Sequence, residues 1–75
     1  MQDATKLRVS LKAARVNAGL RQADAARILG LDRATLASYE TGKTMPKWDT
    51  VSKMETLYGF PASNIFFGKQ SALSE

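Results

Sequence analysis

The spacing of apolar residues and glycines divides the chain into short helical segments. Glycines and prolines separate segments of roughly 8 to 13 residues, which is the length of an ordinary helix. Leu7, Leu11, Ala14 and Ala18 fall on one face of a helix, and this pattern predicts a first helix that stops at Gly19. No segment long enough to count shows the alternation of a β-strand.

Glycine stops and capping residues predict three further helices. Residues 22–29 are a run of helix formers that ends at Gly30. Asp32 is a suitable N-cap for a helix over about 33–41, which Gly42 ends. A fourth helix before Gly59 is predicted by the helical spacing of Trp48, Val51, Met54, Leu57 and Tyr58.

The last apolar residues predict a short fifth helix and complete the expected fold. Pro61 suits the first position of a helix, and Ile65 and Phe66 would then face inward. The sequence therefore predicts one all-α domain of five helices over residues 1–75, with a core of about 7–67 and a polar tail at 68–75. A domain of this size buries only about 60% of the surface of its unfolded chain, so its stability is marginal.

Composition narrows the chemistry that the domain can perform. Cysteine and histidine are both absent, which removes disulfides, thiolate metal sites and the usual general base, and we expect no cofactor. No apolar run approaches the roughly 20 residues that span a bilayer, and the first residues lack the pattern of a secretory signal. We therefore expect a soluble, cytoplasmic protein without a membrane partner.

The charge is unevenly distributed along the chain. The formal net charge is +4, and residues 1–47 hold nine of the eleven Lys and Arg residues but four of the seven Asp and Glu residues. A basic front half suggests a face that meets a polyanion. A solvated basic surface would look the same, so charge alone leaves both interpretations open.

The link between the second and third helices is the most informative local feature. The turn Gly30-Leu31-Asp32 has three residues and contains a glycine, which can adopt a positive φ without steric cost. Leu31 can fill the angle between the two helices. Two helices joined by such a turn form a helix-turn-helix unit, although many all-α proteins contain similar corners.

At this point the sequence resembles the helix-turn-helix family of the phage repressor and Cro type, the XRE-like transcriptional regulators of prokaryotes and phages. The resemblance covers roughly residues 7–67, in register. It is carried by Leu11, Arg15, Gly19, Leu20, Gln22, Ala26, Leu29, Gly30, Leu31, Leu36, Tyr39, Glu40, Gly42, Pro46, Leu57, Gly59, Phe60, Ile65 and Phe66. Ala25 departs from the usual leucine, and Lys47 and Pro61 stand where the family often has a serine-like cap.

The resemblance implies a sequence-specific regulator, expected to be a repressor, that places its third helix in the major groove of double-stranded DNA. The residues that would face base edges are Arg33, Ala34, Ala37 and Ser38. The sharpest of them is Arg33, since arginine can bind guanine O6 and N7 together. The residues that would contact phosphates are Arg21, Gln22, Thr35, Thr41, Lys43 and Thr44. For Arg33 the alternatives are a phosphate contact or a solvated side chain, and for Lys43 the alternative is a solvated lysine.

The resemblance also implies roles away from the DNA. Arg15 and Glu40 would pair and tie the first helix to the end of the third. Trp48, Tyr39, Phe60 and Phe66 are expected in the core. Because one module covers too little DNA for a selective site, we expect a homodimer on a palindromic operator. Its contact would use Phe67, with Phe60 and Met54 at the edge, unless Phe67 folds back over the core.

Two other classes of function compete with DNA binding. An enzyme is disfavoured, because no carboxylate pair or lysine has a catalytic spacing. Gly42-Lys43-Thr44 resembles the end of a phosphate-binding loop but lacks the upstream glycine and strand. An antitoxin-type interaction module that also binds DNA is the better rival, and copurification of a second small protein would favour it. The tail at 68–75 is short and polar for a toxin-binding segment. No small-molecule ligand is evident.

Overall fold

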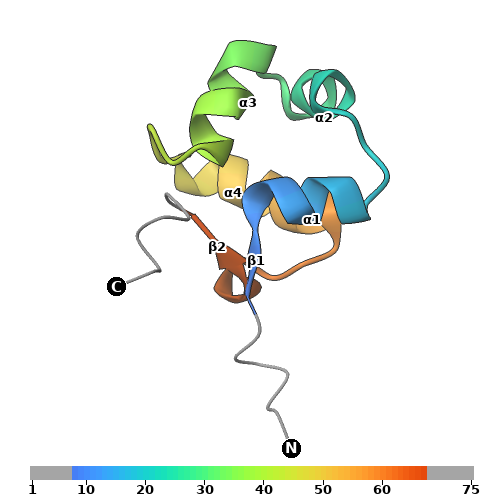
Figure 1. Cartoon of the computed structure of the whole chain (residues 1–75), viewed down its shortest axis with the longest axis vertical. Helices are drawn as coiled ribbons and strands as arrows, with labels where there is room; N and C mark the ends of the chain where they lie inside the picture. Colours follow the sequence, from blue (N-terminus) through green and yellow to red (C-terminus); the bar gives the residue numbers. More distant parts are fainter. Residues whose placement is uncertain (1–7, 68–75) are drawn as a thin grey trace, which may run out of the picture.

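A computed structural model describes residues 8–67 of the chain, and four α-helices make up most of it (Figure 1). Helices α2 and α3 lie at one end of the domain, α1 and α4 cross its middle, and two short strands lie at the other end. In chain order the elements are β1 (Val9–Ser10), α1 (Leu11–Asn17), α2 (Gln22–Leu29), α3 (Arg33–Glu40), α4 (Trp48–Tyr58), a 3-10 helix (Ala62–Asn64) and β2 (Ile65–Phe66).

The predicted second, third and fourth helices are confirmed nearly to the residue, whereas the first begins later than expected. Ser10 caps α1, because its hydroxyl oxygen accepts a hydrogen bond from the backbone N–H of Ala13 at 3.0 Å. Val9 and Ser10 are extended in β1, so the helix cannot continue back toward Leu7, which lies outside the described residues.

The mostly helical class is confirmed, whereas the predicted fifth helix is not: within residues 8–67, four α-helices are accompanied by one short strand pair. The segment after Gly59 forms one 3-10 turn and then β2, which pairs in parallel with β1 in the register Val9↔Ile65 and Ser10↔Phe66. Pro61 is extended at the start of the turn, and the following β-branched and aromatic residues favour a strand. The Glu55 carboxylate of α4 accepts a hydrogen bond from the Ala62 N–H at 2.6 Å, which fixes the turn against α4.

The core lies between α1, α4 and the inner faces of α2 and α3. Its largest fully buried side chains are Leu11, Leu36 and Met54. The expectation that Trp48 belongs to the core is wrong, because 71% of that residue is exposed. Trp48 is the first residue of α4, whereas the buried residues of that helix begin at Val51. The apolar face of α4 therefore extends beyond the core at the start of the helix.

The corner between α2 and α3 is closed by backbone geometry. Gly30 has φ +75°, and a Cβ added there would meet no atom within 4 Å, so the backbone angle rather than space favours glycine. The Leu31 N–H then donates to the Ala26 carbonyl at 2.8 Å. Asp32 caps α3 by accepting from the Thr35 N–H at 3.0 Å. The corner therefore fixes where the first turn of α3 points.

Candidate nucleic-acid interface

The first turn of α3 is the most exposed part of the helix. Arg33 and Ala34 are exposed, whereas Ala37 and Ser38, one turn later on the same face, are half-buried. Hydrogen bonding from Thr35 to the Asp32 cap lowers the pKa of that carboxyl below its ordinary value, so the cap is charged at neutral pH. A ligand approaching this end of α3 would meet Arg33 and Ala34 first.

The last turn of α3 is anchored by a buried ion pair. Arg15 Nε lies 2.7 Å from Glu40 Oε2, and Arg15 Nη2 donates to Glu40 Oε1 at 3.3 Å. The two side chains are 8% and 4% exposed. Arg15 Nη1 also donates to the Leu20 carbonyl at 2.8 Å. The guanidinium thus ties α1, the segment after it and the end of α3 together.

Gln22 extends this polar contact from the last turn of α3 to its first residue. Its Nε2 donates to Glu40 Oε1 at 3.1 Å, and its Oε1 accepts from Arg33 Nε at 3.4 Å. The second bond is long and therefore weak. It uses one of the five N–H donors of the Arg33 guanidinium, so the group retains donors for a ligand. The sequence predicted that Gln22 contacts a phosphate but did not predict that it bridges Glu40 and Arg33.

A hollow of about 430 Å³, lined mostly by charged and polar residue types, opens beside Gln22. Helix α2 begins there without a side-chain cap, so its first N–H groups face solvent or a ligand. An uncapped helix N-terminus with nearby cations favours a phosphate. Lys12 of α1 was missed at the sequence level, although it lies one turn before Arg15. The hollow is lined by Lys12, Arg15, Arg21, Gln22, Ala37, Glu40 and Thr41.

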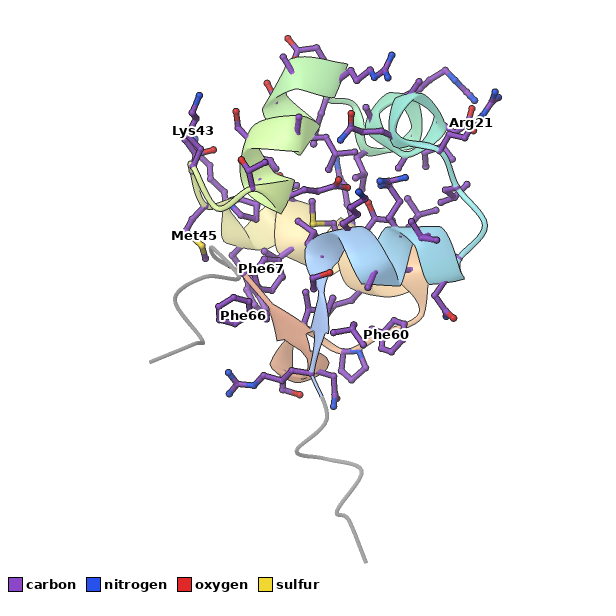
Figure 2. All side chains as sticks on the ribbon, in the orientation of Figure 1. Arg21, Lys43, Met45, Phe60, Phe66 and Phe67 are labelled. Carbon is purple, nitrogen blue, oxygen red and sulfur yellow. The ribbon has the colours of Figure 1, made fainter. Side chains whose placement is uncertain are left out.

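Arg21 lies on one side of the exposed face of α3, before α2, and Lys43 lies on the other side, after α3 (Figure 2). Arg21 Nε lies 3.0 Å from Asp24 Oδ2, and the Arg21 side chain is 87% exposed. The hydrogen bond from Arg21 lowers the pKa of Asp24 and raises that of Arg21. Exposed pairs of this kind are worth little, so the contact does not restrain Arg21 from meeting a phosphate.

The segment after α3 brings Lys43 and Thr44 to the surface. Gly42 has φ +79°, and both following N–H groups donate to the Ser38 carbonyl, at 2.9 Å from Lys43 and 3.4 Å from Thr44. Both side chains are exposed. Thr41 is exposed as well, but its hydroxyl donates back to the same carbonyl at 3.3 Å. Thr35 is half-buried next to the Asp32 cap.

The three residues expected at a dimer contact do not share one exposed surface. Met54 is 0% exposed, so it has no surface for a partner. Phe60 and Phe67 are half-buried and pack against the core, as expected if Phe67 folds back. Figure 2 shows these two rings on opposite sides of the strand pair. The expected edge of the contact at Met54 is therefore wrong, because that side chain fills the centre of the core.

Two helices joined by a tight glycine turn, with the first turn of the second helix exposed and its last turn anchored, define a helix-turn-helix domain. The family model for the helix-turn-helix domain matches residues 6–65, and the chain belongs to this family. The predicted resemblance to regulators of the phage repressor and Cro type is thereby confirmed. The family is one of DNA-binding regulators, not a class of enzymes.

A curated relative adds to this assignment. The chain is 31% identical over 61 residues to the cryptic phage CTXphi transcriptional repressor RstR of Vibrio cholerae. The match covers 81% of this chain and 55% of the relative, so the chain spans about half the length of that protein. Within residues 8–67, no helix is both long and apolar enough to span a membrane.

Proposed function

We propose that this domain is a transcriptional repressor that binds double-stranded DNA sequence-specifically, with α3 in the major groove. The observation that carries the proposal is the polarity of α3, whose last turn is held by Arg15 and Glu40 while Arg33 and Ala34 project from the first turn. A recognition helix contacts base edges with its N-terminal residues, so its C-terminal end is free to be fixed to the rest of the domain.

The base-reading roles follow from the chemistry of the exposed face. Arg33 would bind guanine O6 and N7, and Ala34 would pack its methyl group on a thymine methyl. Ala37 and Ser38 lie deeper on the same face and would meet the bases after the helix has entered the groove. In the free domain, Arg33 Nε donates to Gln22 Oε1 at 3.4 Å, and so long a bond leaves the guanidinium able to turn toward a base edge.

The phosphate-binding roles divide between two flanks. On one side, the hollow at the uncapped start of α2 is lined by Lys12, Arg21 and Gln22. On the other side, Lys43 and Thr44 follow α3, with Thr41 and Thr35 as the remaining hydroxyl candidates. Contacts on both flanks would clamp the two backbones of one groove, setting the register without carrying sequence information.

Repression is proposed because the relative is a phage transcriptional repressor. One module would bury roughly 600–1,000 Å² against DNA, which is small for a selective site. Two copies related by a two-fold axis would place their α3 helices about 34 Å apart and read a palindrome. We therefore propose that the repressor acts as a homodimer on such an operator.

Selection from a pool of random DNA duplexes tests the function without a known operator. The domain should enrich a short motif with two inverted half-sites, and binding should weaken steeply as salt rises, because several phosphates are neutralised. Recovery of unenriched DNA, or of no DNA, would overturn the assignment. The selected duplex then serves as the probe for every variant below.

A further inference from the structure

The two most exposed large apolar residues of the described chain lie three positions apart in sequence. Trp48 is 71% exposed and Met45 is 63% exposed, against 56% for Val16 on α1 and 52% for Ile28 on α2. Three residues span at most about 11 Å of chain, so the two residues lie close together at the surface of the domain. Pro46 between them is buried, whereas Met45, Lys47 and Trp48 are all exposed.

Opposite charges flank the tryptophan. Lys47 and Asp49 are both exposed, and among residues 8–67 neither forms an ion pair within the chain. We call Met45, Lys47, Trp48 and Asp49 the Trp48 patch. A two-fold axis through Trp48 would bring the lysine of one copy to the aspartate of the other. The patch is therefore complementary to itself in charge as well as apolar at its centre.

The position of the patch suits a partner that is bound to the same DNA. Met45 directly follows Lys43 and Thr44, which flank the proposed DNA-binding surface. Figure 2 shows Met45 at the edge of the domain below Lys43, on the side where Phe66 and Phe67 lie. A second copy seated at this edge would lie alongside the first on the duplex, with its own α3 toward the next groove.

We propose that the Trp48 patch is the contact between two copies of this chain on DNA; its biological setting rests on the proposed function. The patch is an alternative to the expected contact at Phe67 with Phe60 and Met54 at its edge, because Phe67 and Phe60 pack against the core and Met54 is buried. An aromatic side chain buries about 150–250 Å² when fully covered, so 71% exposure leaves roughly 110–180 Å² per copy for the contact. Even with Met45, the total stays below the about 1,200 Å² of a stable interface. The free domain is therefore mainly monomeric, and DNA brings the copies together.

The tryptophan is itself the probe for this contact, because the chain has one Trp. Its fluorescence should shift to the blue when two copies bind a duplex with two selected half-sites, and should stay unshifted on a duplex with one. Wild type should bind the two half-sites cooperatively. Trp48→Ala should lose about tenfold or more of that cooperativity, as expected for an aromatic anchor, while its affinity for one half-site is unchanged. Ile28→Ala, another exposed apolar residue, is the matched control and should retain cooperativity.

A charge exchange tests the two-fold geometry. Lys47→Asp and Asp49→Lys should each weaken cooperativity, and the double variant should restore it, since the pair is re-formed with opposite sense. Circular dichroism checks that every variant remains folded. A blue shift on a single half-site, cooperativity that survives Trp48→Ala, or no rescue in the double variant would overturn the proposal.

The free protein separates this proposal from the proposed function. Sedimentation up to about 1 mM, the range of a weak dimer, should show self-association that Trp48→Ala abolishes. If DNA binds without cooperativity and the free protein stays monomeric, the Trp48 contact is wrong while DNA binding stands. If no DNA is selected but the free protein pairs through Trp48, the proposed function is wrong and the contact stands.

Discussion

The two ends of α3 carry polar residues in opposite environments. At the first turn, Arg33 is exposed and donates a long hydrogen bond of 3.4 Å to Gln22. At the last turn, the Glu40 side chain is 4% exposed and lies 2.7 Å from Arg15. Within eight residues, α3 therefore goes from an exposed first turn that can contact DNA to a last turn fixed by a buried ion pair. The same helix can present side chains to a ligand because it is fixed from behind.

The last turn of α3 is fixed by the Arg15–Glu40 ion pair, although burying an apolar contact there would cost less free energy. Burying an ion pair costs desolvation that its attraction only partly offsets, so such a pair is weak support for stability alone. Its hydrogen bonds do fix direction, since Arg15 meets both Glu40 oxygens. Nearby, burial raises the pKa of Tyr58 to about 12, with a further contribution from the charge of Glu40, so the phenol stays neutral around the pair. We infer that the ion pair sets the angle of α3.

Removal of the support should have the largest effect on the domain. Glu40→Ala leaves Arg15 buried and uncompensated, which should lower the free energy of unfolding by about 3–5 kcal/mol. That is a large share of the total for a domain of this size. Thermal denaturation without DNA measures it. Asp24→Ala, which removes a half-buried carboxylate from two ion pairs with exposed arginines, is the matched control and should lower the melting temperature far less. Equal effects from the two variants would show that burial at the last turn does not matter.

A change at the readable end should affect binding rather than stability. Arg33→Ala should cost about 1–3 kcal/mol on the selected duplex and relax the preference at one base pair. The melting temperature should stay near that of wild type, because the lost bond to Gln22 is long and exposed. Competition against duplexes with single base changes measures the preference. A loss that is the same for every sequence would make Arg33 a phosphate contact instead.

The cap at the start of α3 should contribute less. Asp32→Ala removes the bond to the Thr35 N–H and should lower the melting temperature by less than Glu40→Ala does. The pKa of Asp32 is lowered on folding, so this contribution is present above the unfolded pKa of about 3.9 and is lost as pH falls through the folded pKa. Denaturant unfolding at a series of pH values below 7 should therefore show the difference between wild type and variant shrink as the pH falls through the lowered pKa of Asp32. Asp32→Asn retains a capping side chain that does not titrate, so it should be close to wild type at pH 7 and should not lose its cap in acid.

The sequence predicted the elements that local signals define. Gly30 and Gly59 stop α2 and α4 at the expected residues, and Asp32 starts α3, because caps and positive-φ glycines act within one turn. Strands β1 and β2 were not predicted. Each has two residues, which is too short for an alternating pattern, and they pair across most of the chain.

Side-chain positions that depend on tertiary packing were harder to predict. The exposure of Trp48 could not be read from helical spacing, since the spacing gives a face of α4 but not where the core ends. The pairing of Arg15 and Glu40 followed from the family resemblance. The bridge through Gln22 and the position of Lys12 both depend on how α1, α2 and α3 meet, which no local pattern contains.

The smallest expected effect comes from the lysine beyond the last turn of α3. Lys43 is exposed and follows Gly42, so Lys43→Ala should leave stability unchanged and weaken binding by a similar factor on every DNA sequence. If Lys43 neutralises one phosphate, the slope of log affinity against log salt should become shallower by about 0.9. Lys53→Ala on α4 removes the same charge from an exposed position away from the proposed surface and should leave the slope at the wild-type value. Because both variants lower the net charge by one, a change in both slopes would show a general effect of charge, and a change in neither would remove Lys43 from the interface.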